Sequence, residues 1–170
     1  MIKLKFSIIS IFIFCNVYSQ VYTFPYDTVK FDKVGLYYIS NKKCDLIKYK
    51  VIVNDSVNKC YSLKCYLKPN DIKKIRQILI DTLTYGATDL SCSLYDYGIV
   101  FFNNQHIAGY ISISLQCDKV FSSLPIYGNE YYKIKYDDYY TYSCFSKIGK
   151  KKLSNYFNKK GLKNKFEYRN

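Results

Sequence analysis

The chain of 170 residues is short of the residue types from which many catalytic and metal sites are built. It has no tryptophan and a single histidine, His106. The sequence has no Cys-x-x-Cys pair, whereas structural zinc sites use cysteine and histidine ligands clustered at such short spacings. A Ser-His-Asp triad would have to use His106, and there is no Gly-x-Ser-x-Gly elbow. We therefore expect no metal, no cofactor and no serine hydrolase chemistry.

Glycine and proline are also few, at 7 and 3 residues, and they form no linker beyond the N-terminal segment. The sequence contains no internal repeat and no low-complexity segment. A chain of about 150 residues can bury the core of one domain, but not comfortably of two. We predict a single domain over residues 20–170.

Residues 1–19 have the three parts of a secretory signal peptide. Two lysines precede an apolar run at residues 6–14, which is shorter than the roughly 20 residues that a membrane-spanning helix needs. Val17 and Ser19 then fit the third and first positions before a cleavage site. We expect cleavage before Gln20 and a secreted or periplasmic protein of the cell envelope. The alternative is an uncleaved membrane anchor.

Two segments have the three- and four-residue apolar spacing of amphipathic helices. The first, residues 70–85, starts at an Asn-Asp pair that can cap free amides, and Gly86 stops it. The second, residues 146–161, is capped by Ser146 and stopped by Gly161. The apolar positions of the two helices are Ile72, Ile75, Leu79 and Leu83, and Ile148, Leu153, Tyr156 and Phe157.

Residues 97–117 predict a β-hairpin that turns within residues 103–106. Its second strand alternates with a period of two, so we expect one buried face and one open face. The residues on the expected buried face are Ile107, Gly109, Ile111, Ile113 and Leu115. Other strand-forming runs lie at residues 34–39, 46–53, 59–67 and 131–136. The predicted class is α+β, an antiparallel sheet with two helices packed on it and disulfides in support.

Six of the 7 cysteines remain once a signal peptide containing Cys15 is removed, an even number that is typical of disulfides in a secreted protein. If the hairpin turns about residues 104 and 105, Cys92 and Cys117 face each other at its open end. Their Cα atoms would then be close enough for a disulfide. The alternative is two unpaired buried thiols.

The remaining four cysteines allow several connectivities. A hairpin centred near Asp55 would pair residues 46–53 with 59–67, and this would bring Cys44 close to Cys65. Cys60 would then be left for Cys144.

The charge is strongly positive, with 26 lysines and arginines against 13 acidic residues. Residues 146–170 hold nine of the basic residues and one acid, Glu167. Only Arg76 and Arg169 are arginines, whereas specific phosphate or base recognition favours arginine. The codon bias of an AT-rich genome accounts for the excess of lysine, so we predict no nucleic-acid partner. We expect contact with an anionic envelope lipid or polysaccharide, or with another protein, through Lys150, Lys151, Lys152, Lys159 and Lys160.

No motif in the sequence predicts a catalytic site. Asp137 and Asp138 are the only adjacent carboxylates, and neighbours in an extended strand point to opposite faces. We therefore expect a non-enzymatic secreted or periplasmic envelope protein that binds a partner through a basic surface. The alternative is a small secreted hydrolase or inhibitor, which a pocket containing His106 or two carboxylates would favour.

Two stretches resemble small secreted proteins of Bacteroidetes-type bacteria. The first runs from Cys92 through the G-I-V-F-F strand at residues 98–102 and a second strand to Cys117, and the other is the C-terminal helix with its Gly-Leu end at residues 161–162. Members of that group carry two closing cysteines after the second strand, whereas this chain has Ser114 at the first of those positions. The resemblance implies an exported protein of this fold type, pairs Cys117 with Cys92, and implies no activity.

Overall fold

A computed structural model describes residues 29–40, 50–86, 95–126, 133–135, 140–143 and 145–162, and only the backbone of 133–135 and 140–143. The expected signal peptide lies outside the described residues. So do Cys44, Cys92 and Cys144, and the carboxylates Asp137 and Asp138.

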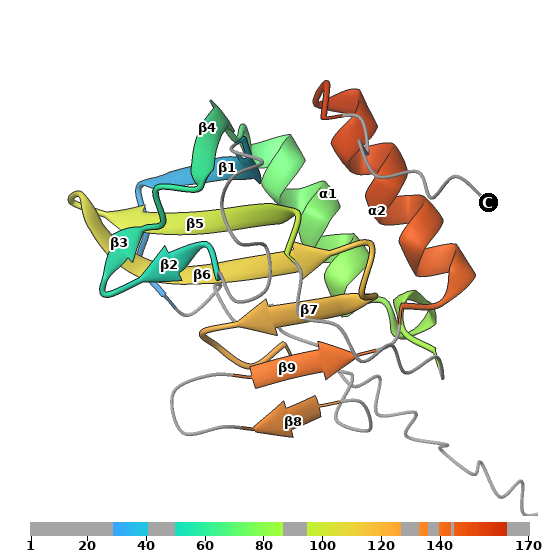
Figure 1. The fold of residues 1–170 in the computed structure, drawn as a ribbon. Coiled ribbons are helices and arrows are strands. Elements are labelled where there is room, and N and C mark those ends of the chain that lie inside the picture. The colour runs from blue at the N-terminus through green and yellow to red at the C-terminus, as the bar shows by residue number, and fades with distance from the viewer. Residues whose placement is uncertain are drawn as a thin grey trace, which may run out of the picture.

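Seven strands form one sheet in the order β4-β1-β5-β6-β7-β9-β8, and every neighbouring pair is antiparallel. A separate hairpin of β2 and β3 lies in front of this sheet (Figure 1). The sheet strands are β1 (Lys33–Ile39), β4 (Tyr61–Tyr66), β5 (Tyr97–Asn103), β6 (His106–Ser114), β7 (Lys119–Ser122), β8 (Lys133–Lys135) and β9 (Tyr140–Ser143), and the hairpin consists of β2 (Ile52–Val53) and β3 (Ser56–Val57).

Two helices, α1 (Pro69–Ile80) and α2 (Lys147–Lys159), lie together on the opposite side of the sheet from the β2–β3 hairpin (Figure 1). The predicted α+β class, with an antiparallel sheet and two packed helices, is confirmed. No helix among the described residues is long and apolar enough to cross a membrane. We refer below to the helix face and the hairpin face of the sheet.

The first helix ends earlier than predicted. The Asp81 carboxylate accepts a hydrogen bond from the Leu83 amide at 2.9 Å, and this starts a separate 3-10 turn, η2 (Thr82–Thr84). Leu83 is 61% exposed and therefore does not extend the apolar stripe of α1. The early end places Asp81 at the surface between the two helices.

The second helix begins and ends as predicted, with the Ser146 hydroxyl accepting from the Gly149 amide at 3.0 Å. Its apolar face differs in one position, because Ile148 is 53% exposed. Gly149 is buried instead and lies directly against η2, where a Cβ atom would be 2.0 Å from the Thr84 carbonyl oxygen. A residue without a side chain is needed for this close approach.

The main hairpin turns where predicted, at Asn104 and Gln105, which both have positive φ angles of 49° and 72°. A β-bulge then shifts the register between Phe101 and Phe102, so Phe101 pairs with Gly109. The prediction that Cys92 faces Cys117 assumed one unbroken register along the whole hairpin. The bulge moves the pairing by one residue from Phe101 toward the open end, so the geometric argument for that pair is wrong.

The bulge also changes which residues share a face. Ile107 packs with Val100 and Phe102 on the hairpin face, whereas Ile111 and Ile113 belong to the core under the helices. Both faces of this part of the sheet are covered. The expectation of one buried and one open face is therefore wrong.

The β2–β3 segment covers the second face. Val51 is fully buried, and its amide donates to the hydroxyl of Ser112 on β6 at 3.0 Å. Gly98 on β5 permits this contact, because a Cβ atom there would be 2.2 Å from the Val51 side chain. The result is a second, smaller core cluster around Val51, Ile52 and Tyr37.

The predicted pairing of residues 46–53 with 59–67 is wrong. Strand β2 pairs with β3 for two residues only, across the turn at Asn54 and Asp55. Strand β4 pairs with β1 instead, which places Cys65 opposite Leu36.

Candidate binding surfaces

The five lysines predicted to contact a partner lie on or just after α2, but three of them are engaged within the protein. These three bridge from α2 to carboxylates on other segments. The ion pairs are Lys150–Asp118 at 2.8 Å, Lys152–Asp81 at 2.5 Å and Lys160–Asp71 at 2.6 Å. Lys150, Lys152 and Lys160 therefore attach α2 to the rest of the domain, and the partner contact predicted for them stays a prediction.

Two of these acids have pKa values that are lowered by the paired lysine. The hydrogen bond from Lys160 lowers the pKa of Asp71, and the hydrogen bond from Lys152 lowers the pKa of Asp81, each below the ordinary 3.8. The Asp71 carboxylate also accepts from the Lys68 amide at 3.3 Å at the start of α1. These ion pairs connect the two ends of α1 with α2.

The other two predicted lysines, Lys151 and Lys159, are exposed and have no ion pair with another described residue. The same is true of three further lysines on the outer side of the helices, which sequence reasoning missed because α1 carried no obvious charge cluster. We call the resulting set the outer lysines: Lys73, Lys74, Lys147, Lys151 and Lys159.

A shallow groove runs between the two helices, with a volume of about 400 Å³. Lys74 and Lys159 lie along it, together with the amide side chains of Gln77 and Asn155. Asp81 also borders the groove, but Lys152 occupies its carboxylate. The groove therefore offers two lysines that form no ion pair with a described acid, although Lys74 lies close enough to Asp71 to help lower its pKa.

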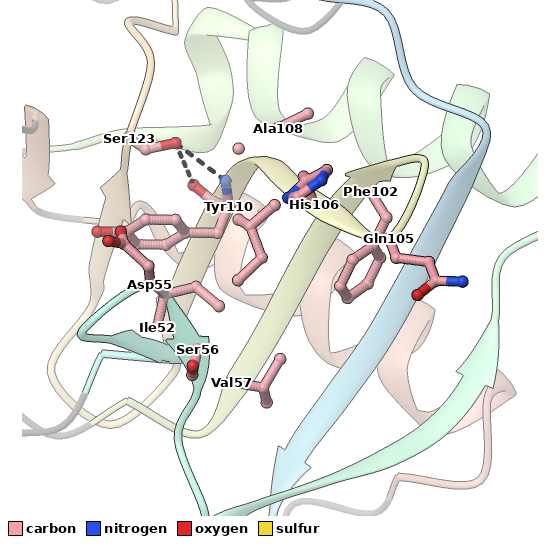
Figure 2. A pocket seen from close by; sticks show the side chains of 12 residues that line it. Ile52, Asp55, Ser56, Val57, Phe102, Gln105, His106, Ala108, Tyr110 and Ser123 are labelled. Atoms are coloured by element: carbon pink, nitrogen blue, oxygen red, sulfur yellow. Dashed lines mark hydrogen bonds between the residues drawn. The ribbon is translucent and has the colours of Figure 1, made fainter.

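A second hollow lies on the hairpin face, between the β2–β3 hairpin and the tip of the β5–β6 hairpin (Figure 2). Its volume is about 670 Å³. Aromatic and aliphatic side chains, including Phe102 and Tyr110, form part of its lining, and His106 and Asp55 lie at its rim. We call it the hairpin pocket.

The hairpin pocket contains His106, but it does not assemble a catalytic triad. The hydroxyl of Ser123 accepts from the Tyr110 amide at 2.9 Å and also contacts the Tyr110 carbonyl, so it is bound to backbone. Among the described residues, His106 has no hydrogen-bond partner for its side chain, and Asp55 is the only carboxylate in the lining. The lining also holds the Ser56 hydroxyl together with His106 and Asp55, but no hydrogen bond joins these three side chains among the described residues, and Asp55 has no second acid with it in the lining. A pocket containing His106 is the observation expected to favour the hydrolase alternative, which therefore stays a prediction beside the binding protein.

The cysteines differ from the predicted pattern. Cys65 is a free, half-buried thiol, which contradicts the expected bridge from Cys44 to Cys65. Cys60 and Cys117 are each disulfide-bonded. Strands β1 and β5 separate them, and three strand spacings amount to about 14 Å, too far for a bond between the two.

The partners of Cys60 and Cys117 therefore lie outside the described residues.

Sequence reasoning also missed a buried carboxylate. Asp96 is 8% exposed and accepts a hydrogen bond from the Leu115 amide at 2.8 Å, where the chain leaves β6. Burial raises the pKa of Asp96 to about 6. Its side chain holds the β6–β7 connection and lies in neither hollow.

Among the described residues, no three His, Cys, Asp or Glu side chains gather where they could hold a metal ion. Neither a protein-family model, nor a curated protein, nor a solved structure matches the chain. The basis for a function is therefore the chemistry of these two surfaces.

Proposed function

We propose that this protein is a non-enzymatic, secreted or periplasmic protein of the cell envelope that binds an anionic partner through the outer side of its two helices. The observation that supports this most is the set of outer lysines, which are exposed and form no ion pair with a described acid. The ion pairs at Asp71 and Asp81 hold the helices together and so hold these lysines in place.

The type of cation favours a particular class of partner. Lysine is a flexible point charge, whereas arginine recognises single phosphates in a fixed bidentate geometry. A surface of exposed lysines therefore suits a repeating anionic surface, on which many weak contacts add. Headgroups of anionic lipids and acidic polysaccharides share this chemistry.

Export and disulfides belong to the same proposal. A domain that works outside the cytoplasm would keep disulfides at Cys60 and Cys117, because that compartment is oxidising. The cross-links would supplement the core clusters on the two faces of the sheet.

The decisive experiment removes the two groove lysines. The variant Lys74→Gln/Lys159→Gln should bind phosphatidylglycerol vesicles or alginate about 30-fold more weakly, because each lysine near an anionic surface contributes about 1 kcal/mol. Co-sedimentation with each probe at low salt measures this, and comparison of the two separates lipid from polysaccharide. Binding of the unaltered chain should also weaken as salt is raised.

The matched control is Lys30→Gln/Lys59→Gln, which removes the same charge at two exposed lysines of other segments. It should change binding less than about threefold. An equal loss in both variants would attribute binding to net charge alone, and unchanged binding in the groove variant would overturn the proposed surface.

A further inference from the structure

The hairpin pocket lies on the opposite face of the sheet from the basic surface and shares no lining residue with the groove between the helices. Two β-turns face it, one from the β2–β3 hairpin and one from the β5–β6 hairpin (Figure 2). Between them, apolar side chains of both hairpins form the floor. These are Ile52, Val57, Phe102 and Ile107.

The rim of the pocket carries polar side chains that are not used by the protein. Asp55 and Ser56 come from one hairpin, and Gln105 and His106 come from the other. All four are exposed, and none of their side chains makes a hydrogen bond or ion pair with another described residue. The pocket thus combines an apolar floor with open donors and acceptors, which is the usual composition of a small-molecule site.

Two of these side chains belong to residues with a strained backbone conformation. Asp55 and Gln105 occupy the second position of their two-residue turns, with φ angles of 56° and 72°. Glycine is preferred at this position, because other residues are strained at positive φ. Both turns therefore carry a polar side chain at the pocket rim where glycine would fit the backbone better.

The charge of the pocket excludes the partner proposed for the helices. Its lining contains one carboxylate and no lysine or arginine. An anionic ligand would meet Asp55 with nothing to neutralise it. A neutral ligand rich in hydroxyl groups fits better, since carboxylate, amide and imidazole side chains can each bond hydroxyls.

We propose that the hairpin pocket binds a neutral carbohydrate. A pyranose ring has an apolar face of C–H groups, which suits the apolar floor, and a circumference of hydroxyls, which suits the polar rim. The floor offers mainly aliphatic surface and the edges of the aromatic rings, because Phe102 is only 9% exposed and Tyr110 stacks on Phe121. The volume of about 670 Å³ accommodates one or two sugar units.

The test is a titration of the ¹⁵N-labelled mature chain with glucose, N-acetylglucosamine, maltose and chitobiose, followed by backbone amide shifts. We expect at least one of these sugars to shift the amides of residues 55–57 and 105–110 in a saturable way. Two further probes test the chemistry. Mannitol has hydroxyls but no ring face, and glucuronic acid has the ring with a negative charge, so both should bind at least tenfold more weakly.

The variant Asp55→Gly/Gln105→Gly removes two rim side chains and relieves the two turns. It should keep or raise the melting temperature and weaken sugar binding at least tenfold. The matched control is Asn54→Gly/Asn104→Gly, which changes the first position of the same turns outside the pocket lining, and it should bind as the unaltered chain does.

Three results would overturn this inference: none of the four sugars shifts the hairpin amides, mannitol binds as well as the sugars, or the two glycine variants bind equally. None of these results bears on the basic surface, because vesicle and alginate binding depends on the outer lysines.

Discussion

Polar side chains on the two faces of the sheet are used in different ways. Over the helix face, three acids are each neutralised by a lysine, and these ion pairs hold α2 in place. At the hairpin pocket, the polar side chains of the rim have no partner within the described residues. The number of charges in a sequence therefore does not indicate how many are available for binding.

The largest expected difference between the two faces is in stability. Phe157 is fully buried and stacks on Tyr97 with ring centroids 3.9 Å apart. Phe157→Ala should lower the free energy of unfolding by about 4 kcal/mol, because it leaves a large cavity. Val51→Ala, in the smaller cluster of the hairpin face, should cost about 2 kcal/mol. Urea unfolding measures both, and equal losses would contradict the view that the helix face dominates stability.

The buried carboxylate Asp96 differs from the paired acids of the helix face, because its pKa is raised and theirs are lowered. Burial raises its pKa from 3.8 to about 6, so the folded state loses stability relative to the unfolded chain as the pH rises from about 4 to 6, and the loss is complete above 6. Asp96→Asn should therefore be more stable than the unaltered chain at pH 7, by up to about 3 kcal/mol. The advantage should shrink as the pH falls through 6 and vanish below about 4. A variant that is less stable at pH 7 would show that the bonds to the Leu115 and Gln116 amides outweigh the cost of burial.

The ion pairs should give the smallest effect and the opposite pH dependence. Lys152→Gln should cost about 1 kcal/mol at low salt and less at high salt, since Lys152 is 40% exposed. Lys152 lowers the pKa of Asp81, so this stabilisation is present above the ordinary 3.8 and is lost as the pH falls through the lowered value. Lys151→Gln is the matched control and should change stability by only a few tenths of a kcal/mol. Equal costs for the two variants would contradict a structural role for Lys152.

Local signals predicted much of this fold. Ser146 and Gly161 mark the ends of α2, and Asn104 and Gln105 form the turn of the main hairpin, because caps and turns depend on neighbouring residues alone. The pairing of β4 with β1 could not be read from the sequence in this way. It joins segments separated by the β2–β3 hairpin, whereas local patterns predicted a pairing of residues 59–67 with the nearer run at residues 46–53.

The bulge in the main hairpin shows how a small local change defeats a periodic pattern. The bulge inserts one extra residue at Ala108. The alternation of β6 is therefore out of phase before and after it, and Ile107 faces the opposite side of the sheet from the one that the simple pattern predicts. Ile107 thereby moves to the hairpin pocket, and the register expected for Cys92 and Cys117 is lost. No propensity of Ala108 marks this position in the sequence.

The candidate surfaces were predicted only in part. The concentration of lysine in the C-terminal helix predicted five contact residues, of which Lys151 and Lys159 are exposed, but the acids that pair with the other three lie far away in the chain. Asp71 is separated from Lys160 by most of the sheet sequence, so only the fold reveals that pair. The hairpin pocket combines residues of two hairpins, and a single-chain pattern gives no signal for it.

The position of α2 at the end of the described chain has a consequence for how the protein is made. The ring of Phe157 completes the helix-side core by stacking on Tyr97, which precedes it by 60 residues. A chain that emerges from its N-terminus therefore keeps this part of the core open until Phe157 has been released. Contacts of such long sequence separation form slowly. Packing of α2 would therefore be a late step in folding, because the sheet strands that it covers are made before it.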